Sequence, residues 1–369
     1  MRNVNRASKS IIFSGLLCAI GLISGCGGGK IGGPVAAEYV YVATGTGVAQ
    51  FSVTTSGQLT PLTPPEVVAA PAPFNTVWVT VSKDAKYVYA ANQTQGTISQ
   101  FSIGASGAIT ALTPATVNAG AAPVSVEVTP DAKYVYCLNQ TDNTIQQYSV
   151  GVSGALTVLA PPTVPVAAGG NTLTISPNGL YLYACSPSSN TISAYTIGSN
   201  GQLTPQTVPT YTLTLATSAA ISPDSTHLYC PCSTGTAQYS IGAGGALTPL
   251  GTPIAPAGGG GSGFTSFAVS ANGKHGYMAE FTNGVLASPI DQYNIGLDGS
   301  LTAMSPAFVS AGMNSSWVIT EPVGNYVFVS NRFDHTISEF LVAKSGNLGA
   351  ESPAFVTPTG ALQMAIVSR

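Results

Sequence analysis

Hydrophobic and polar positions alternate along most of this chain. Short runs such as Thr97–Ile103 and Thr144–Val150 are rich in β-branched and aromatic residues that alternate with polar ones over most of their length, which is typical of strands with one buried face. Clusters of Gly, Pro, Asn and Asp separate the runs and indicate turns. No segment of the repeated region has a helical period. The pattern therefore predicts an all-β protein built from many short strands.

The strands belong to a unit of about 47 residues that recurs seven times. A Tyr-Val-Tyr motif marks each unit, and its third position is Tyr41, Tyr89, Tyr136, Tyr183, Tyr229, Tyr277 and Phe328. One strand precedes the motif, a second carries it, and two more follow, joined by a hairpin in which glycines supply positive φ angles. Seven units of four antiparallel strands predict a seven-bladed β-propeller over residues 38–369.

The two ends of the repeated region complement each other. The first unit begins at Glu38 without a strand before its motif, whereas residues 362–367 have the pattern of that missing strand. We therefore expect the C-terminal strand to complete the first blade and close the ring, because an exposed apolar edge would pair with another chain. An open solenoid of the same units would leave this last strand unexplained.

The N-terminus has the pattern of an export signal. Basic residues precede an apolar stretch at 11–23, which is too short to span a bilayer. It ends in Ile-Ser-Gly-Cys, which resembles the lipobox of bacterial lipoproteins. The resemblance implies a signal peptide at 1–25, lipidation of Cys26, a Gly-rich tether at 26–37 and a place in the cell envelope. Gly27 implies the outer membrane, on the periplasmic or the surface side. The alternatives are an ordinary cleaved signal peptide and a short signal anchor.

Composition narrows the function. Only 7% of the residues are charged, against roughly 25% in an ordinary soluble domain. Lys and Arg are not clustered, which excludes nucleic-acid binding. Without residues 1–25 the chain carries 8 Lys+Arg against 14 Asp+Glu, a net charge of −6. His, Asp and Glu show no metal-ligand spacing, so we expect neither a metal nor a cofactor.

The repeat makes two glutamates conspicuous. Glu280 stands three positions past the motif tyrosine, where the other units have Thr44, Asn92, Asn139, Ser186, Cys232 and Asn331. Glu127 lies on a predicted inner strand, where sister blades have Thr80, Thr174, Ala220 and Ala268. A carboxylate at either place can act as a base or recruit a cation. The plainer interpretation is a solvated or hydrogen-bonded glutamate.

Other polar residues are equally few. Arg332 is the only arginine between residue 7 and the final residue, and it lies beside Asp334 and His335 in one blade loop. A surface ion pair is the simplest expectation for this cluster. His227 and His275 occupy a column that is tyrosine in other units, so we interpret both as tyrosine substitutes on a strand.

Four cysteines remain after the signal and Cys26, and all lie on or next to the motif strand of consecutive blades. They are Cys137, Cys185, Cys230 and Cys232. Cys185 points to the opposite face from the other three, because successive strand residues alternate. In an exported protein Cys185 can therefore form a disulfide with Cys137, Cys230 or Cys232. Four buried free thiols are the alternative.

The Tyr-Val-Tyr strands, Ser/Thr-Pro-Asp turns and Gly-x-x-Gly-x-Leu-Thr hairpins resemble the bacterial lactonase-like propellers, a family that includes 6-phosphogluconolactonase. The motif at 328–331 is similar to the wider class of Tyr-Val-x-Asn propellers. The resemblance implies lactone hydrolysis with a histidine in an early blade, an Arg-His pair before a later inner strand, and a following glutamate. At the matching positions this chain has Val124, Thr265 and Ser266, and only Glu280 is retained.

Two functions follow from these patterns. The first is a lipid-anchored binding or scaffold module at the cell envelope, for a protein, glycan or small molecule. The alternative is a lactonase-like hydrolase with a degenerate site, in which Glu280 is the base and Glu127 and Arg332 assist. The sequence does not decide whether the protein is an enzyme. The hydrolase requires these three residues to converge on one mouth of the central channel.

Overall fold

The structure is a computed structural model of the chain. It describes residues 37–68, 70, 72, 75–257, 263–281, 287–350, 355–357, 360 and 362–369. Residues 1–36, which hold the expected signal peptide, Cys26 and most of the tether, lie outside this part, as do residues 258–262.

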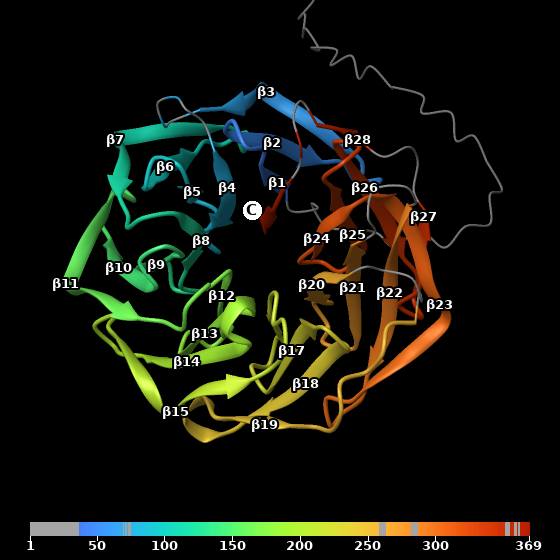
Figure 1. Cartoon of the computed structure of the whole chain (residues 1–369). Coiled ribbons are helices and arrows are strands. Elements are labelled where there is room, and N and C mark those ends of the chain that lie inside the picture. The colour runs from blue at the N-terminus through green and yellow to red at the C-terminus, as the bar shows by residue number, and fades with distance from the viewer. Residues whose placement is uncertain are drawn as a thin grey trace, which may run out of the picture. The chain divides into compact units, whose positions relative to one another are not determined.

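Seven antiparallel sheets form a ring of blades around a central axis (Figure 1). Blade one is β29 (Met364–Ser368), β1 (Glu38–Ala43), β2 (Val48–Val53) and β3 (Leu59–Val67). Blade two is β4 (Thr76–Val81), β5 (Tyr87–Asn92), β6 (Thr97–Ile103) and β7 (Ile109–Asn118). Blade three is β8 (Pro123–Val128), β9 (Tyr134–Asn139), β10 (Thr144–Val150) and β11 (Leu156–Pro165). Within each blade the strands run from the axis outward in the order given.

The remaining blades follow the same plan. Blade four is β12 (Thr172–Ile175), β13 (Tyr181–Ser186), β14 (Thr191–Ile197) and β15 (Leu203–Thr212). Blade five is β16 (Ala220–Ile221), β17 (His227–Cys232), β18 (Gly235–Ile241) and β19 (Leu247–Pro249). Blade six is β20 (Gly263–Val269), β21 (His275–Phe281), β22 (Ala287–Ile295) and β23 (Leu301–Met313). Blade seven is β24 (Ser315–Thr320), β25 (Tyr326–Asn331), β26 (Thr336–Val342) and β27 (Leu348–Ala350), with β28 (Phe355–Val356).

The helices of the described chain are two short 3-10 turns, η1 (Pro187–Ser189) and η2 (Ala243–Gly245). Neither is long and apolar enough to cross a membrane.

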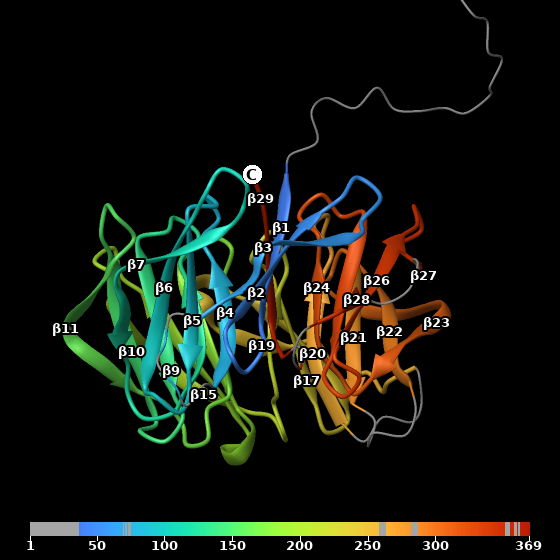
Figure 2. The ribbon, with the colours of Figure 1, turned by 90° about the horizontal axis from the view of Figure 1, so that it is seen from above.

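The predicted ring closure is confirmed. Strand β29 pairs antiparallel with β1, with Met364 opposite Val42 and Ser368 opposite Glu38, and Figure 2 shows the two strands side by side. Blade seven differs from its sisters in that β26 pairs with two separate segments, β27 and β28. In other blades with a long outer strand, that one strand continues through a register shift and pairs with both ends of its neighbour, as β15 does with β14.

Packing between blades comes from the tyrosines of the repeated motif. Seven hydrophobic clusters of the described residues each join two neighbouring blades. At six junctions the third motif tyrosine is fully buried, and its hydroxyl donates to a glycine carbonyl in the next blade's hairpin. The pairs are Tyr41 with Gly107, Tyr89 with Gly154, Tyr136 with Gly201, Tyr183 with Gly245, Tyr229 with Gly299 and Tyr277 with Gly346. Phe328 at the ring-closing junction has no hydroxyl.

The first motif position explains the same hairpin glycines. The Tyr87 ring lies so close to Gly154 that an added Cβ would sit 2.2 Å from its Cε1, and Gly154 has φ +86°. Only glycine fits such a place. His227 and His275 make the same contact with Gly299 and Gly346, which confirms that both replace a tyrosine ring.

A buried glutamine also links successive blades. Gln147 donates from Nε2 to the Pro161 carbonyl at 3.1 Å and accepts from the Leu203 backbone N–H at 2.6 Å. Gln50, Gln100, Gln238 and Gln292 accept from the next blade in the same way. At the ring-closing junction the acceptor is a carboxylate, Glu339, which takes the Leu59 N–H at 3.0 Å.

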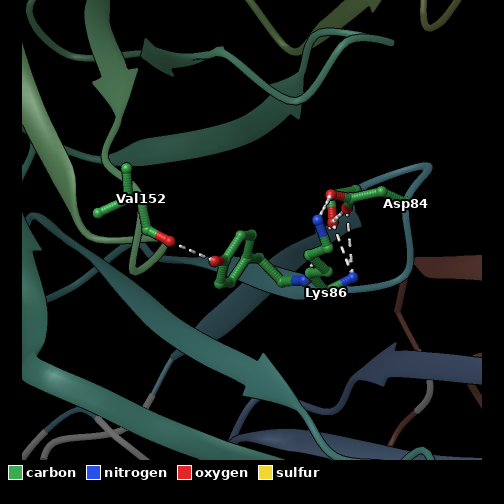
Figure 3. Close-up of polar contacts among 5 residues, drawn as sticks. Asp84, Lys86 and Val152 are labelled. Atoms are coloured by element: carbon green, nitrogen blue, oxygen red, sulfur yellow. Dashed lines mark hydrogen bonds and ion pairs between the residues drawn. The ribbon is translucent and has the colours of Figure 1, made fainter.

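The two faces of the ring have different connections. The turns between the first and second strand of each blade, such as 82–86 and 129–133, form what we call the turn face. There Ser82 donates to Asp84 at 2.7 Å, Lys86 pairs with Asp84 at 3.2 Å, and the Tyr87 hydroxyl donates to the Val152 carbonyl (Figure 3). The loops that enter the innermost strands form the opposite side, the loop face.

Candidate functional site

Two chambers lie in the central channel, between the innermost strands. A chamber of about 480 Å³ opens on the loop face and one of about 370 Å³ opens on the turn face. Trp78, Trp317 and Gln363 line both chambers, so they lie where the two chambers meet, and we call them the partition. We call the two spaces the loop-face chamber and the turn-face chamber.

The partition is built around a pair of tryptophans. The Trp78 and Trp317 rings lie 4.7 Å apart, edge to face at 73°. They occupy equivalent places on β4 and β24, the innermost strands on either side of β29. Sequence reasoning did not single them out. Comparison of their column would have done so, because the other blades have Ser125, Thr172, Ser218, Ser266 and Gln363 there.

Glu127 faces the turn-face chamber from β8. Its Oε1 accepts from Trp78 Nε1 at 3.2 Å and its Oε2 accepts from Thr80 Oγ1 at 3.3 Å. Burial raises the pKa of the Glu127 carboxyl to about 8, and the two hydrogen bonds oppose this rise only in part. At neutral pH this carboxyl is therefore mostly protonated. The other charged residue among the described residues lining this chamber is Lys83.

Arg332 lines the loop-face chamber and comes from the end of β25. The described residues around it are amides, hydroxyls and apolar groups, and none is a carboxylate. The ones with amide or hydroxyl side chains are Asn75, Gln93, Asn171, Thr172, Thr217, Thr265, Ser316 and Gln363. Arg332 is exposed, so its guanidinium is accessible from the loop face.

The expected ion pair between Arg332 and Asp334 is not formed. Asp334 instead accepts from the Met313 backbone N–H at 2.9 Å and from the Thr336 hydroxyl at 3.1 Å. The ion pairs within the described chain are Lys86 with Asp84 and Lys133 with Asp131, both on the turn face. The expectation failed because the backbone N–H of Met313, at the end of β23, and the hydroxyl of Thr336, at the start of β26, already satisfy the Asp334 carboxylate.

Glu280 lies inside blade six. It is on β21, is 0% exposed, and is absent from the described lining of both chambers. Its neighbours are Asp291 and Tyr293 on β22: burial raises the pKa of Tyr293, and the charges of Asp291 and Glu280 raise it further. Asp291 Oδ2 accepts from the Tyr293 hydroxyl and the Ala257 N–H, both at 3.0 Å. Glu280 thus belongs to a buried polar group.

The three residues proposed for catalysis are therefore not brought together. Glu127 faces one chamber, Arg332 faces the other, and Glu280 is enclosed in a blade. Asp291 was missed by sequence reasoning. Comparison of the units would have found it, because Asp291 is a carboxylate where the equivalent positions of the other units are uncharged. These positions are Ala49, Ser99, Gln146, Ser193, Ala237 and Ser338.

The four propeller cysteines are free thiols, and all are buried. Cys185 lies beside Cys230, but the two Sγ atoms are 4.0 Å apart and not bonded, so the structure has the alternative of four buried free thiols in place of a disulfide from Cys185. Burial raises the pKa of the Cys137 and Cys230 thiols above the ordinary range. The chemistry of a thiolate nucleophile is therefore suppressed at both. No group of three or more potential metal-binding side chains occurs among the described residues.

Comparisons with known proteins agree with this architecture. A family model described as "Lactonase, 7-bladed beta-propeller" matches residues 35–159. A putative 6-phosphogluconolactonase from Bacteroides fragilis superposes with a TM-score of 0.76 at 20% identity, covering 90% of this chain and 98% of that one. The resemblance to lactonase-like propellers is confirmed. No curated protein matches the sequence significantly.

Other lactonase-like structures superpose almost as well. A putative 6-phosphogluconolactonase from Bacteroides uniformis has a TM-score of 0.75 at 17% identity, covering 90% of this chain and all of that one. The Pseudomonas aeruginosa periplasmic gluconolactonase has a TM-score of 0.72 at 17% identity, covering 90% and 99%. Identities this low establish a shared fold and leave the activity to be argued from the site.

The positions at which the family resemblance implies histidine and arginine can now be placed. Val124 and Thr265 both line the loop-face chamber, while Ser266 is buried and accepts the Val318 N–H at 2.8 Å. Two of these three positions, Val124 and Thr265, therefore line the chamber that holds Arg332. The three supply an apolar group and hydroxyls in place of cations and imidazoles.

Proposed function

We propose that this protein is a binding module that takes a small, hydroxyl-rich organic anion in the loop-face chamber. The observation that carries the proposal is Arg332, which forms no ion pair with a described residue and lies beside amides and hydroxyls in a chamber with no carboxylate in its described lining. A guanidinium binds a carboxylate with two parallel hydrogen bonds. The surrounding amides and hydroxyls are suited to ligand hydroxyls.

The shape and walls of the chamber support a small ligand. Its volume of about 480 Å³ falls in the usual range for small-molecule sites, which combine an apolar wall with a few polar groups. Trp78 and Trp317 close its inner end, and indole faces pack against the C–H faces of a sugar-like ligand. A sugar acid matches this combination of charge, hydroxyls and apolar wall.

Hydrolysis is less well supported than binding. A lactone hydrolase needs a group that activates water next to the groups that stabilise the developing oxyanion. Glu127 lies beyond the tryptophan partition and is mostly protonated at neutral pH, and Glu280 is enclosed in blade six. The relatives named as gluconolactonases still make a lactone hydrolase the second candidate for this chain.

Calorimetry with sugar acids tests the binding proposal. We expect D-gluconate to bind and D-glucose to bind at least about tenfold more weakly, because an ionic hydrogen bond contributes about 1.5–3 kcal/mol. Arg332→Gln should abolish this preference. Arg369→Gln is the matched control, since it removes an arginine charge from the C-terminus. Equal affinity of Arg332→Gln and the unaltered protein for gluconate would refute the proposal.

The hydrolase is tested separately. We expect no hydrolysis of D-glucono-δ-lactone beyond the spontaneous rate. Enzymatic turnover that is lost in Glu280→Gln, while the thermal unfolding of that variant stays unchanged, would overturn the binding module in favour of the hydrolase.

We also propose that the propeller is exported and held in the cell envelope, at the outer membrane, through lipid on Cys26. The support is the sequence pattern at 1–26. Cys26→Ser should prevent incorporation of radiolabelled palmitate and release the protein from the membrane fraction. Continued labelling of that variant would contradict the anchor.

A further inference from the structure

We propose a second binding site, for an organic ammonium group, in the turn-face chamber at Glu127. This site is independent of the anion site proposed above, since it lies on the other side of the Trp78–Trp317 partition and offers a carboxyl where the anion site offers a guanidinium.

The Glu127 carboxyl is held in place without an ion-pair partner among the described residues. Its two hydrogen-bond donors, the Trp78 indole and the Thr80 hydroxyl, are both uncharged. The donors fix the orientation of the carboxyl toward the channel and leave lone pairs on both oxygens available. A ligand that brings a positive charge supplies the ion pair that Glu127 does not form with any described residue.

The walls of the chamber favour a cation with an apolar body. Leu173, Ile175, Ala219 and Met364 contribute to the lining, together with both tryptophans. Burial of apolar ligand surface against such side chains stabilises the complex by about 25 cal/mol per Å². An indole face that meets an ammonium group adds about 0.5–2 kcal/mol. The volume of about 370 Å³ admits a compact alkylammonium ion.

A metal ion fits this chamber poorly. Hard divalent cations take six or more oxygen ligands, whereas Glu127 is the one carboxylate among the described lining residues, and no group of three metal-binding side chains occurs in the described chain. An anion gains no ion pair from Glu127 in either protonation state of the carboxyl. An organic ammonium ion needs only one carboxylate and gains from the apolar wall.

Binding of an ammonium ion should be linked to a proton. The carboxyl is mostly protonated at neutral pH, since its pKa is about 8, and it must ionise to pair with the cation. Affinity should therefore rise with pH toward 8 and level off above it, and binding at pH 7 should release about 0.9 proton. The one other titratable group among the described lining residues is Lys83, whose positive charge opposes entry of the cation.

Calorimetry with n-butylammonium chloride tests the site. We expect binding about fifty-fold weaker at pH 6 than at pH 8, from the fraction of Glu127 that is ionised at each pH. Proton release is measured at pH 7 by repeating the titration in buffers with different ionisation enthalpies. n-Butanol, which lacks the charge, should bind at least about tenfold more weakly.

The variants separate the carboxylate from net charge. Glu127→Gln should weaken butylammonium binding at least about tenfold and remove its pH dependence. Glu66→Gln removes the same charge from the outer strand β3 and should leave both unchanged. Thermal unfolding of each variant verifies its fold. The site is refuted by tight binding to Glu127→Gln, by pH-independent affinity, or by no binding at millimolar butylammonium. None of these results bears on gluconate at Arg332.

Discussion

At the residue scale, stability depends on polar groups that are buried and paired across blade junctions. Tyr136 is fully buried, and its hydroxyl donates to the Gly201 carbonyl at 2.8 Å. Tyr134, two residues earlier, donates to the Ser199 carbonyl at 3.0 Å, but in an exposed place. Water can replace the second bond and cannot reach the first. The two tyrosines therefore form a matched pair.

Tyr136→Phe should lower the free energy of unfolding by about 1–3 kcal/mol, because it leaves the buried Gly201 carbonyl without its donor. Tyr134→Phe, which removes the same atom, should cost less than about 0.5 kcal/mol. Denaturant unfolding of both variants measures the difference. Equal costs would mean that the buried hydroxyls do not hold the blades together.

Two carboxyls meet at the ring-closing junction. Glu38 on β1 and Glu321 in the turn before β25 are both buried. Burial, together with the neighbouring Glu321 carboxyl, raises the pKa of Glu38 from an ordinary value of 4.5 to about 9. Glu321 is stabilised by the Asn325 N–H at 2.8 Å. The folded protein therefore keeps a proton on Glu38 that the unfolded chain has lost.

This pKa shift gives the sign of a pH dependence. Between about pH 4.5 and pH 9 the folded state binds more protons than the unfolded state, so stability should fall as the pH rises through this window. Glu38→Gln removes the effect. It should stabilise the protein by at least about 1 kcal/mol at pH 8 and have little effect at pH 4.

Thermal unfolding between pH 4 and pH 9 measures the dependence, and Glu66→Gln controls for the loss of one carboxylate. If Glu38→Gln unfolds at the same midpoint temperature as the unaltered protein at pH 8, the Glu38 carboxyl does not destabilise the folded state.

At the element scale, the strands and their order could be predicted because the same four-strand sequence pattern recurs in seven units. The alternation of hydrophobic and polar residues predicted the strands. The first unit lacks a strand before Glu38, and the C-terminal segment has the pattern of that strand, so the pairing of β29 with β1 was expected. The repeat could not predict that Glu280 is buried, because its burial within blade six depends on the side chains that pack around it. The partition was not predicted either, since Trp78 and Trp317 meet only when the ring closes.

Ring closure by β29 should be essential for the monomer. Gln363 Oε1 accepts the Val79 N–H at 2.7 Å, and Met364 and Val367 are buried in the clusters that join blade one to its neighbours. Ending the chain before Leu362 removes these contacts and exposes the edge of β1. We expect a loss on the order of 5 kcal/mol or more, comparable to the total stability of a domain.

The truncated chain should also self-associate, because an unpaired apolar edge strand recruits another chain. Thermal unfolding and light scattering measure both effects. Removal of Arg369 alone is the control, since it leaves β29 intact. A truncated chain that stays monomeric and equally stable would show that β29 is dispensable.

At the scale of the whole molecule, scarce charge is placed so that opposite signs stay apart. Arg332 opens to the loop face and Glu127 to the turn face, with Trp78 and Trp317 between them. Had the two residues shared one chamber, they would pair with each other and leave little charge for a ligand. The partition therefore keeps an anion site and a cation site in one channel.

The partition is asymmetric, and this asymmetry supports a final prediction. Trp78 Nε1 donates to Glu127 at 3.2 Å, whereas Trp317 contributes only its ring to the described contacts of the chamber. Trp78→Phe and Trp317→Phe remove similar indole area and should weaken gluconate binding to within about twofold of each other. Only Trp78→Phe removes a donor that stabilises the ionised carboxylate.

Butylammonium binding should therefore weaken about tenfold more in Trp78→Phe than in Trp317→Phe, since a hydrogen bond to a charged group contributes about 1.5–3 kcal/mol. The midpoint of its pH dependence should move above 8 in Trp78→Phe alone, because the lost donor had favoured ionisation. Calorimetric titrations of both variants with both ligands measure this difference. Equal losses of butylammonium binding would mean that Trp78 serves Glu127 only as a wall.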